Sequence, residues 1–519
     1  MRRYFALVAV LALASVPAFA AKKSSAKKTS KAPKERTVVT HATAMIAGHR
    51  LAYTTTAGTL LLYNKAHHPI ASVFYIAYTK NGAKAAERPI AFAYNGGPGF
   101  ASALVDIGGF GPRRLVWPAP GQIAAEQPPY RLEDNAYSIL NATDLVFIDA
   151  VGTGYSRIVG AGKPKMFFGF NADASAFSQF IQRYSARFDR WNSPKFLLGE
   201  SYGTTRNAVL AYDLVSKGVY LNGVIMCSTV LDFPTINFTA GNDLPFALYL
   251  PSYAAVAWYH HMIHPAPASL PAWVHQAEAY ARGAYAAALF QGSSLSAARR
   301  SQVAARLSHF TGIPAAYWLK ANLRMTLPVF MRRVLGPSGP MTGRYDGRFT
   351  IPELQPVSPT PGYTNEGATT SAIWGVLTAS FDHYLSHTLH YSSSRLYKQQ
   401  SGTVFRLWNW TFRSPLNRLG SGVGNLQSRN VAPDLARAMA NDPGMQVLFN
   451  NGYYDMATPF FATNYTIAHM GLTPKLLANI HRDYYPVGHM LYLNPKAMPM
   501  LQRNIDGFIA AASAGHAGA

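Results

Sequence analysis

Hydrophobic residues along this chain are grouped into short apolar runs and longer helix-like segments. The runs are rich in β-branched and aromatic residues and are bounded by glycine, asparagine and proline, a pattern typical of strands. The earliest runs follow one another closely and predict an antiparallel start to a sheet. The later runs alternate with helix-like segments, which predicts a mostly parallel α/β sheet. The predicted strands cover residues 51–54, 59–63, 71–78, 89–94, 145–148, 196–198, 223–226, 447–449 and 480–485.

A long segment between two of these strands breaks the alternation. Residues 238–433 contain helical, aromatic-rich stretches joined by proline-rich loops. An insertion of this length in an α/β sheet is expected to form a helical cap over the carboxyl ends of the strands, where such folds place their sites. We therefore expect a core made of residues 41–237 and 434–519, with the helical cap inserted between its two parts.

The N-terminus has the pattern of a targeting segment. Residues 1–20 combine two arginines, a short apolar run and a small-residue cleavage pattern ending at Ala20, as in a secretory signal peptide. Residues 21–40 are dominated by Lys, Ser, Thr and Ala, a composition that predicts a disordered basic tail. We expect cleavage after Ala20, a periplasmic or secreted location, and weak association of the tail with anionic envelope surfaces.

Positive charge dominates the whole chain. It has 47 Lys and Arg residues against 24 Asp and Glu residues, a formal net charge of +23. This excess favours anionic surroundings or acidic substrates, while the lack of a nucleic-acid-binding motif argues against DNA or RNA as a partner. The single cysteine, Cys227, rules out an intrachain disulfide and, within its apolar run, is expected to be a buried small hydrophobic residue.

The stretch from Lys195 to Ala208 carries the clearest chemical signal. A strand-like apolar run is followed by a G-x-S-x-G match at residues 199–203 and then by a helix-like segment. In this order, a strand that ends in a tight turn exposes the hydroxyl of Ser201 as a nucleophile. The backbone N–H of Tyr202, at the start of the helix, then points to the place where an oxyanion develops.

A glycine-rich loop, Asn95-Gly-Gly-Pro-Gly99, directly follows the predicted strand at residues 89–94. Backbone N–H groups of such a loop can supply a second oxyanion donor, and Gly97 is the best placed candidate. The alternative is a plain tight turn without a chemical role.

An acid and a histidine are expected after late strands, because a nucleophile of this kind is followed along the chain first by its acid and then by its histidine. Asp455 and His489 both lie on loops that follow predicted strands. Asp442 precedes its strand and Asp483 lies within one, so both fit the pattern less well.

Two groups of histidines could suggest a metal site. His383, His387 and His390 share a helical face, and three further histidines lie between residues 260 and 264. No H-E-x-x-H pattern accompanies them and no second cysteine is present, so we expect polar helix faces, with no metal and no cofactor.

Several motifs occur in order along the chain: Asn95-Gly-Gly-Pro-Gly99, Phe147-Ile-Asp-Ala-Val-Gly-Thr-Gly-Tyr-Ser156, Gly199-Glu-Ser-Tyr-Gly203, Asp455 and Gly488-His-Met490. With these motifs the chain resembles the serine carboxypeptidase family of α/β-hydrolases, as a bacterial-type member that lacks disulfides. The resemblance covers about residues 50–235 and 440–510.

The resemblance implies an α/β-hydrolase fold and a Ser-His-Asp triad. It implies the following roles: Ser201 as nucleophile, His489 as general base, Asp455 as its orienting acid, the N–H groups of Gly97 and Tyr202 as oxyanion hole, and Asn95 with a protonated Glu200 as the site for the substrate's terminal carboxylate.

Some positions depart from the well-known eukaryotic members. Those members have a Trp, and a second carboxylic acid that shares a proton with the Glu before the nucleophile, where this chain has Ala93 and Gly109. A family glycine is also replaced by Thr204. The triad is untouched, but the mode of carboxylate recognition is open, and Arg113 or Arg114 is a candidate for an added positive charge.

These observations predict a secreted serine carboxypeptidase that removes C-terminal residues from peptides through an acyl-enzyme. An esterase or acyltransferase with the same triad is the alternative. A binding protein on a hydrolase scaffold is disfavoured, because no catalytic position is substituted.

Overall fold

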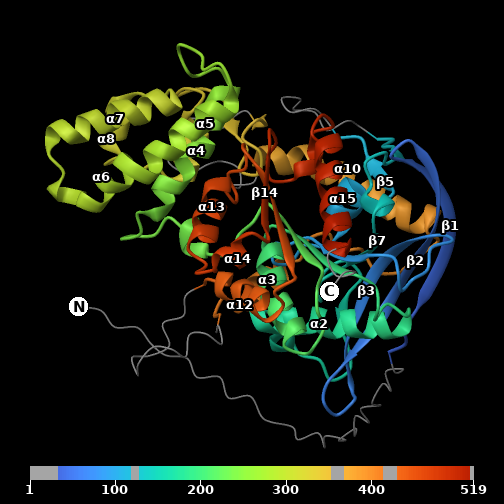
Figure 1. The fold of residues 1–519 in the computed structure, drawn as a ribbon. Coiled ribbons are helices and arrows are strands. Elements are labelled where there is room, and N and C mark those ends of the chain that lie inside the picture. The colour runs from blue at the N-terminus through green and yellow to red at the C-terminus, as the bar shows by residue number, and fades with distance from the viewer. Residues whose placement is uncertain (1–32, 118–127, 352–366, 413–428, 515–519) are drawn as a thin grey trace, which may run out of the picture. The chain divides into compact units, whose positions relative to one another are not determined.

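A ten-stranded sheet forms the centre of the protein in the computed structural model, which describes residues 33–117, 128–351, 367–412 and 429–514 (Figure 1). The strand order is β1-β2-β3-β7-β4-β9-β10-β13-β14, with β8 paired to β3. Strands β1, β2, β3 and β7 pair antiparallel, and all pairs from β7 to β14 along this path are parallel. The strands are β1 Thr37–Ile46, β2 His49–Tyr63, β3 Pro69–Lys80, β4 Ile90–Tyr94, β7 Asp144–Ile148, β8 Arg157–Ile158, β9 Lys195–Glu200, β10 Gly223–Cys227, β13 Gln446–Gly452 and β14 Ile480–Tyr485.

Side chains alternate between the two faces of this sheet, and helices cover both faces. Phe92 and Tyr94 of β4 pack with α2, α3 and α12, whereas Ala91 and Ala93 pack with α10 and α15 on the opposite face. The sequence reads as continuous apolar runs because strands in the middle of such a sheet are buried on both sides. These helices are α2 Phe170–Arg187, α3 Tyr202–Val215, α10 Gly367–His383, α12 Ala432–Asn441 and α15 Met498–Ala514, with α13 Phe460–Ala468 and α14 Pro474–Leu477 between the last two strands.

The predicted C-terminal boundary of the disordered tail, at residue 40, is wrong, because a strand begins at Thr37. Residues 37–40 belong to β1, which pairs with β2 from Thr37 opposite Gly58 to Ile46 opposite His49. The backbone N–H of Thr59 also donates to the carbonyl of Arg36 at 2.8 Å. The polar residues of this segment are compatible with a strand at the sheet edge, whose outer face meets water. The rest of the predicted tail and the predicted signal peptide lie, up to residue 32, outside the described residues.

The two strands predicted at residues 51–54 and 59–63 are one continuous strand, β2. Gly58, taken from the sequence as a break, lies within it. A Cβ at Gly58 would lie 2.8 Å from the carbonyl oxygen of Arg36, so this glycine permits a close approach of the chain rather than a turn.

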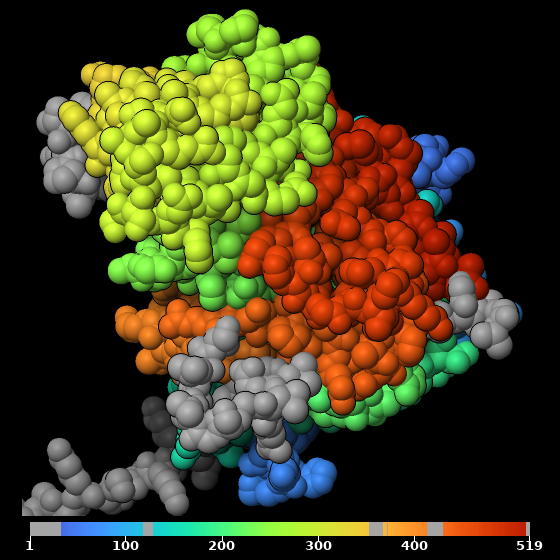
Figure 2. All heavy atoms as spheres, turned by 60° about the vertical axis from the view of Figure 1, so that its left-hand side comes forward, coloured from blue at the N-terminus to red at the C-terminus, as the bar shows by residue number. Residues whose placement is uncertain are grey.

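The inserted segment divides into two parts that pack differently. Its first helices form a lobe with its own apolar cluster, which also includes Tyr454, Met456 and Phe460 from the end of the chain. Figure 2 shows this yellow-green lobe against the red C-terminal segments. The second part, α10 and α11 (Gly402–Leu407), packs on the core instead. The lobe contains α4 Leu244–Tyr259, α5 Leu270–Tyr280, η5 Ala281–Tyr285, α6 Ala286–Gln291, α7 Ala297–Thr311, α8 Ala315–Lys320 and α9 Leu327–Arg333.

Short elements join these layers. Within the described ranges, no helix is both long and apolar enough to cross a membrane. The remaining elements are α1 Ala103–Val105, η1 Asp106–Phe110, β5 Arg113–Leu115, β6 Leu132–Asp134, η2 Ile139–Asn141, η3 Pro164–Met166, η4 Phe233–Thr235, η6 Gly292–Ser294, β11 Met341–Thr342, β12 Thr350–Ile351, η7 Tyr384–Thr388 and η9 Leu491–Leu493.

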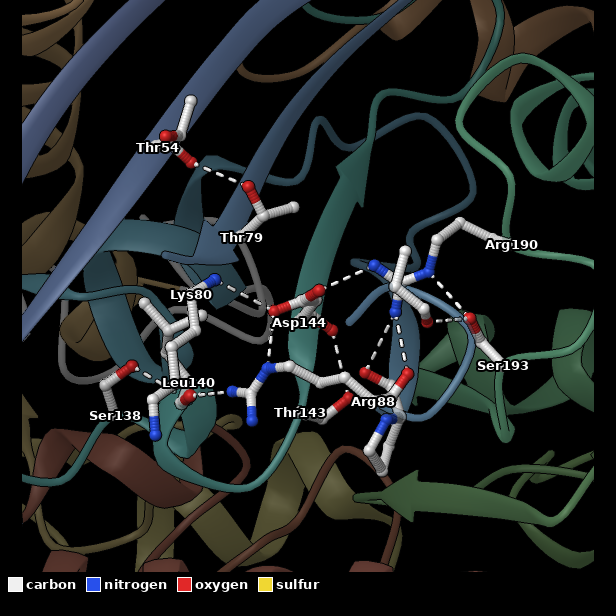
Figure 3. A network of polar contacts seen from close by, with 12 residues as sticks. Thr54, Thr79, Lys80, Arg88, Ser138, Leu140, Thr143, Asp144, Arg190 and Ser193 are labelled. Atoms are coloured by element: carbon white, nitrogen blue, oxygen red, sulfur yellow. Dashed lines mark hydrogen bonds and ion pairs between the residues drawn. The ribbon is translucent and has the colours of Figure 1, made fainter. Parts of the chain in front are cut away.

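A buried ionic network ties together the segments at the amino ends of the parallel strands (Figure 3). Asp144, the first residue of β7, accepts hydrogen bonds from Arg88 at 2.7 Å, Arg190 at 2.6 Å and the backbone N–H of Lys80 at 3.0 Å. Arg190 also donates to the carbonyl of Arg88 at 2.8 Å. Arg88 precedes β4 and Arg190 precedes β9, so one carboxylate connects three neighbouring strands at the end of the sheet opposite to the carboxyl ends.

Asp144→Ala is expected to lower the free energy of unfolding by about 3 to 5 kcal/mol, because it leaves the buried guanidinium of Arg190 and the partly buried one of Arg88 without their counter-charge. Denaturant-induced unfolding measures this loss. The matched control is Asp213→Ala, which removes the exposed Asp213–Lys217 pair and should cost at most about 0.5 kcal/mol. Equal effects of the two substitutions would contradict a structural role for the network.

Candidate active site

A cavity of about 460 Å³ lies at the carboxyl ends of the parallel strands. The loop after β4 and the turn after β9 form its base, and the loop after β14 forms one side. Helices α10 and α11 of the inserted segment close it from the other direction. All of the predicted site residues except Asp455 line this cavity. Those that line it are Asn95, Gly97, Glu200, Ser201, Tyr202 and His489.

Ser201 occupies the tight turn between β9 and α3. Its backbone has φ 59° and ψ −127°, a strained conformation for a residue with a side chain. Close packing requires glycine around it: a Cβ at Gly96 would lie 2.4 Å from the backbone nitrogen of Tyr202, and one at Gly199 would lie 2.3 Å from the carbonyl oxygen of Gly203. The turn is therefore pressed against the loop after β4, and the partly exposed Ser201 side chain faces the cavity.

The side chains of His489 and Asp455 meet beside this cavity. The Nδ1 atom of His489 lies 2.8 Å from Oδ2 of Asp455, and both side chains are buried. The other carboxylate oxygen of Asp455 accepts from the backbone N–H groups of Ala457 and Thr458, at 2.8 and 2.9 Å. The Thr458 hydroxyl also donates to Asp455 Oδ2 at 2.8 Å. A carboxylate with this many donors is held in one orientation and remains an acceptor for the imidazole.

The position of His489 is determined by its backbone and by ring contacts. Its N–H donates to the carbonyl of Tyr345 at 2.6 Å, and the two rings lie with centroids 5.1 Å apart. Burial lowers the pKa of His489, but the interaction and hydrogen bond with Asp455 outweigh burial, so the pKa lies above its ordinary value. The imidazolium is thus stabilised, as a group that accepts a proton during a reaction requires.

Gly97 and Tyr202 flank the cavity from two different elements. Gly97 has a φ of +107°, which glycine adopts readily, and it lines the cavity on the loop after β4. Tyr202 is the first residue of α3, and the first N–H groups of a helix have no acceptor within the helix. Both backbones therefore lie beside Ser201, where the sequence predicted the oxyanion donors.

Glu200 and Asn95 form a buried pair next to Ser201. The side-chain nitrogen of Asn95 donates to Oε1 of Glu200 at 2.7 Å, and the Asn95 oxygen accepts from the N–H of Val105 at 3.0 Å. Burial raises the pKa of Glu200 to about 7, against the lowering effect of His489. The Glu200 carboxyl is therefore mostly protonated below neutral pH and can donate a hydrogen bond there.

Arg206, which the sequence analysis did not identify, contacts the backbone of the loop that carries Asn95. It is almost fully buried and donates to Asp173 at 2.7 Å and to the carbonyl of Asn95 at 2.9 Å. Its guanidinium also lies over the Phe177 ring, 4.3 Å from the centroid. No motif marks this arginine, because its partners come from two other segments of the chain. Thr458, by contrast, lies three residues after Asp455, a spacing typical of local side-chain to backbone turns.

The candidates for an added positive charge, Arg113 and Arg114, lie away from the cavity. Arg113 forms an ion pair with Asp134, Arg114 approaches Glu133 at 3.3 Å, and neither lines the cavity. The antiparallel pairing of β5 with β6 holds both pairs. Their position close to Gly109 in the sequence suggested a role at the carboxylate site. In the structure their side chains lie toward acidic residues of β6 instead.

The cavity wall is instead aromatic and basic. Two arginines that the sequence analysis did not identify, Arg344 and Arg429, line it. Arg344 also lies close enough to His489 to influence its protonation. Besides Tyr202, the aromatic lining residues are Phe100, Phe233, Tyr345, Trp374, Phe405 and Trp410.

The histidine groups lie outside the cavity. His383 and His387 stack with ring centroids 4.2 Å apart, and both are exposed together with His390. Among the described residues, no three His, Cys, Asp or Glu side chains are arranged to hold a metal ion. Cys227 is buried, as predicted.

A family model described as serine carboxypeptidase matches residues 39–238. The chain is also similar to the solved structure of KEX1(delta)p, a prohormone-processing carboxypeptidase from Saccharomyces cerevisiae, with 14% identity, coverage of 88% of this chain and 91% of that chain, and a TM-score of 0.55. No sequence among curated proteins matches the chain.

Two other solved structures are similar at lower TM-scores. A proline iminopeptidase from Mycobacterium smegmatis has 13% identity, covers 89% of this chain and 99% of that chain, and has a TM-score of 0.36. A highly thermostable carboxyl esterase from Bacillus coagulans has 11% identity, with coverage of 88% and 98% and a TM-score of 0.35. The family match confirms the resemblance for the motifs within residues 39–238, and the structural likeness to KEX1(delta)p confirms the predicted α/β-hydrolase fold.

Proposed function

We propose that this chain, whose residues 39–238 match a family model described as serine carboxypeptidase, is a hydrolase that removes C-terminal residues from peptides. The observation that carries the proposal is the buried Asn95–Glu200 pair beside Ser201 in one cavity. A hydrolase that cleaves internal bonds or simple esters has no need for two donors next to its nucleophile that match a free carboxylate.

The reaction assigns one task to each group. Ser201 Oγ attacks the last peptide carbonyl, and His489 accepts the hydroxyl proton and passes it to the leaving amine. Asp455 keeps the imidazole in the productive tautomer. The N–H groups of Gly97 and Tyr202 stabilise the oxyanion, and water then hydrolyses the acyl-enzyme in a second step of the same kind.

The terminal carboxylate of the substrate is expected to lie between Asn95 and Glu200. Asn95 has one side-chain N–H left after its bond to Glu200, and a protonated Glu200 offers a second donor. Arg429 adds positive charge to the cavity wall, which favours an anionic substrate end.

The test compares kcat/KM for an N-blocked dipeptide acid with that for its C-terminal amide at pH 6. Two charge-assisted contacts should make the acid react about 30- to 1,000-fold faster, because the amide leaves these groups mismatched. Equal rates would argue against an exopeptidase. They would favour the esterase or acyltransferase alternative, which uses the same triad.

The proposed setting is extracytoplasmic, with peptides rather than nucleic acids as substrates. Support comes from the signal-like composition of residues 1–20 and from the basic residues up to position 36, which suit anionic envelope surfaces. N-terminal sequencing of exported protein tests this assignment, and a chain that retains Met1 would contradict it.

A further inference from the structure

Tyr492, which no sequence motif singled out, packs behind the end of the cavity where Glu200 lies. It belongs to the short helical turn η9, and its side chain is 1% exposed. Its ring lies with its centroid 5.7 Å from that of Phe110. A Cβ added at Gly109 would lie 2.5 Å from the Tyr492 ring. The tyrosine ring therefore occupies the space that a side chain at position 109 would need, and its position is determined by packing.

The polar atoms around Glu200 are not all paired. Asn95 is oriented by Val105 on one side and by Glu200 Oε1 on the other. Neither Glu200 Oε2 nor the Tyr492 hydroxyl has a hydrogen-bond partner among the described residues. The Tyr492 hydroxyl and the Glu200 carboxyl lie near enough that each influences the pKa of the other. No hydrogen bond of ordinary geometry joins them in this structure. Buried polar groups are normally paired, so the open position at Glu200, which lines the cavity, points to a ligand.

We propose that Tyr492 is a positioning residue that holds the Glu200 carboxyl beside Asn95, so that both can donate hydrogen bonds to the terminal carboxylate of a peptide. This inference rests on the proposed function. Tyr492 does not line the cavity, so it acts through Glu200 and does not touch the substrate. Glu200 Oε2 can accept from the tyrosine hydroxyl with one lone pair while its own proton points to a substrate oxygen.

Titratable groups face Glu200 from each neighbouring element: Tyr492 and His489 from the segment after β14, Asp455 from the loop after β13, and Cys227 from the end of β10. Burial raises the pKa of Glu200 to about 7, Asp455 acts in the same direction, and His489 and Tyr492 act in the opposite one. Removing the Tyr492 hydroxyl takes away a donor that favours the ionised carboxylate. The pKa of Glu200 should therefore rise in Tyr492→Phe.

The ratio of kcat/KM for a dipeptide acid to that for its amide isolates this titration. Both substrates need neutral His489, so its protonation cancels in the ratio, and the acid remains ionised throughout the range. A carboxyl with a pKa of about 7 changes from mostly protonated at pH 6 to mostly ionised at pH 8. The ratio should therefore fall about tenfold between these values in the wild type. In Tyr492→Phe we expect it to fall by only about threefold or less.

Two further variants separate positioning from packing. Gly109→Ala keeps the hydroxyl but forces the Tyr492 ring to move, so the ratio should again depend less on pH than in the wild type. Tyr285→Phe removes a buried hydroxyl that bonds the carbonyl of Leu323 in the helical lobe, and should reproduce the wild-type tenfold fall. Fluorophosphonate labelling of Ser201 and thermal unfolding verify that each variant is folded.

The outcomes distinguish the role of Tyr492 from the proposed carboxypeptidase function. A wild type that prefers the acid, together with an unchanged tenfold fall in Tyr492→Phe, overturns the role of Tyr492 and leaves the proposed function in place. A wild type that treats acid and amide alike overturns both. A weaker pH dependence in Tyr492→Phe and Gly109→Ala, but not in Tyr285→Phe, supports the inference.

Discussion

Ser201→Ala is expected to lower kcat by roughly five to six orders of magnitude and to abolish labelling by a fluorophosphonate. The variant retains the cavity and the oxyanion donors, but it has no group that can form the acyl-enzyme. Removing a nucleophile of this kind leaves only the contributions of binding and oxyanion stabilisation. Single-turnover and steady-state rates with an N-blocked dipeptide acid measure the loss.

The matched control for this substitution is Ser216→Ala, at the other end of α3. Ser216 is exposed, and its hydroxyl donates only to the carbonyl of Asp213. It should retain full activity and labelling. Alanine at position 201 adopts the same strained backbone as serine, so thermal stability should change little. A Ser201→Ala variant that still labels at the wild-type level would refute the assignment of the nucleophile.

Asp455→Asn is expected to lower kcat by about 10⁴-fold. The carboxylate accepts the proton on His489 Nδ1 at 2.8 Å and is held by the N–H groups of Ala457 and Thr458. An amide at this position can present its nitrogen to the imidazole, which favours the wrong tautomer and gives the developing imidazolium no counter-charge. Steady-state kinetics over a range of pH measure both effects.

The pH profile of kcat/KM shows how the loss of the Asp455 counter-charge changes the pKa of His489. Asp455 raises the pKa of His489, and the reaction needs the neutral imidazole. Without the carboxylate the pKa of His489 falls, so the acidic limb of kcat/KM should move to lower pH. Asp483→Asn is the control, since Asp483 lies on β14 away from the cavity. A comparable loss in Asp483→Asn, or an acidic limb that moves upward in Asp455→Asn, would contradict this role.

The strands and the order of the site motifs could be predicted from the sequence because they depend on local patterns. An apolar run buried on both faces, such as residues 90–94, is recognisable without knowledge of its neighbours. The turn at Ser201 could be predicted for a similar reason, since the flanking glycines are needed by local close packing. Boundaries were less certain: β1 begins at Thr37 within the segment predicted to be disordered, because its partner β2 supplies the pairing.

The arrangement of the cavity wall and of the proposed carboxylate site depends on contacts between distant segments. Arg206 reaches the carbonyl of Asn95 from α3, and Arg344 enters the cavity wall from the inserted segment. Sequence proximity pointed to Arg113 or Arg114, whereas Arg113 on β5 pairs with Asp134 on the neighbouring β6. A charge near a motif along the chain is not necessarily near it in space, because one residue along a strand reverses the direction of a side chain.

By itself, the sequence determined the α/β alternation, the strained serine turn and the loops that carry the proposed acid and histidine, since each follows from residue type and spacing over a few positions. Only the tertiary structure decided how the inserted segment divides between a separate lobe and the core, and what lies behind Glu200. Tyr492 and Gly109 are far apart along the chain. The Tyr492 ring fills the space that a side chain at position 109 would need, and this is visible only where η1 and η9 pack together. Because protein interiors are closely packed, a large side chain at one position requires a small residue at the position that it contacts. No local sequence pattern shows which two positions will be in contact.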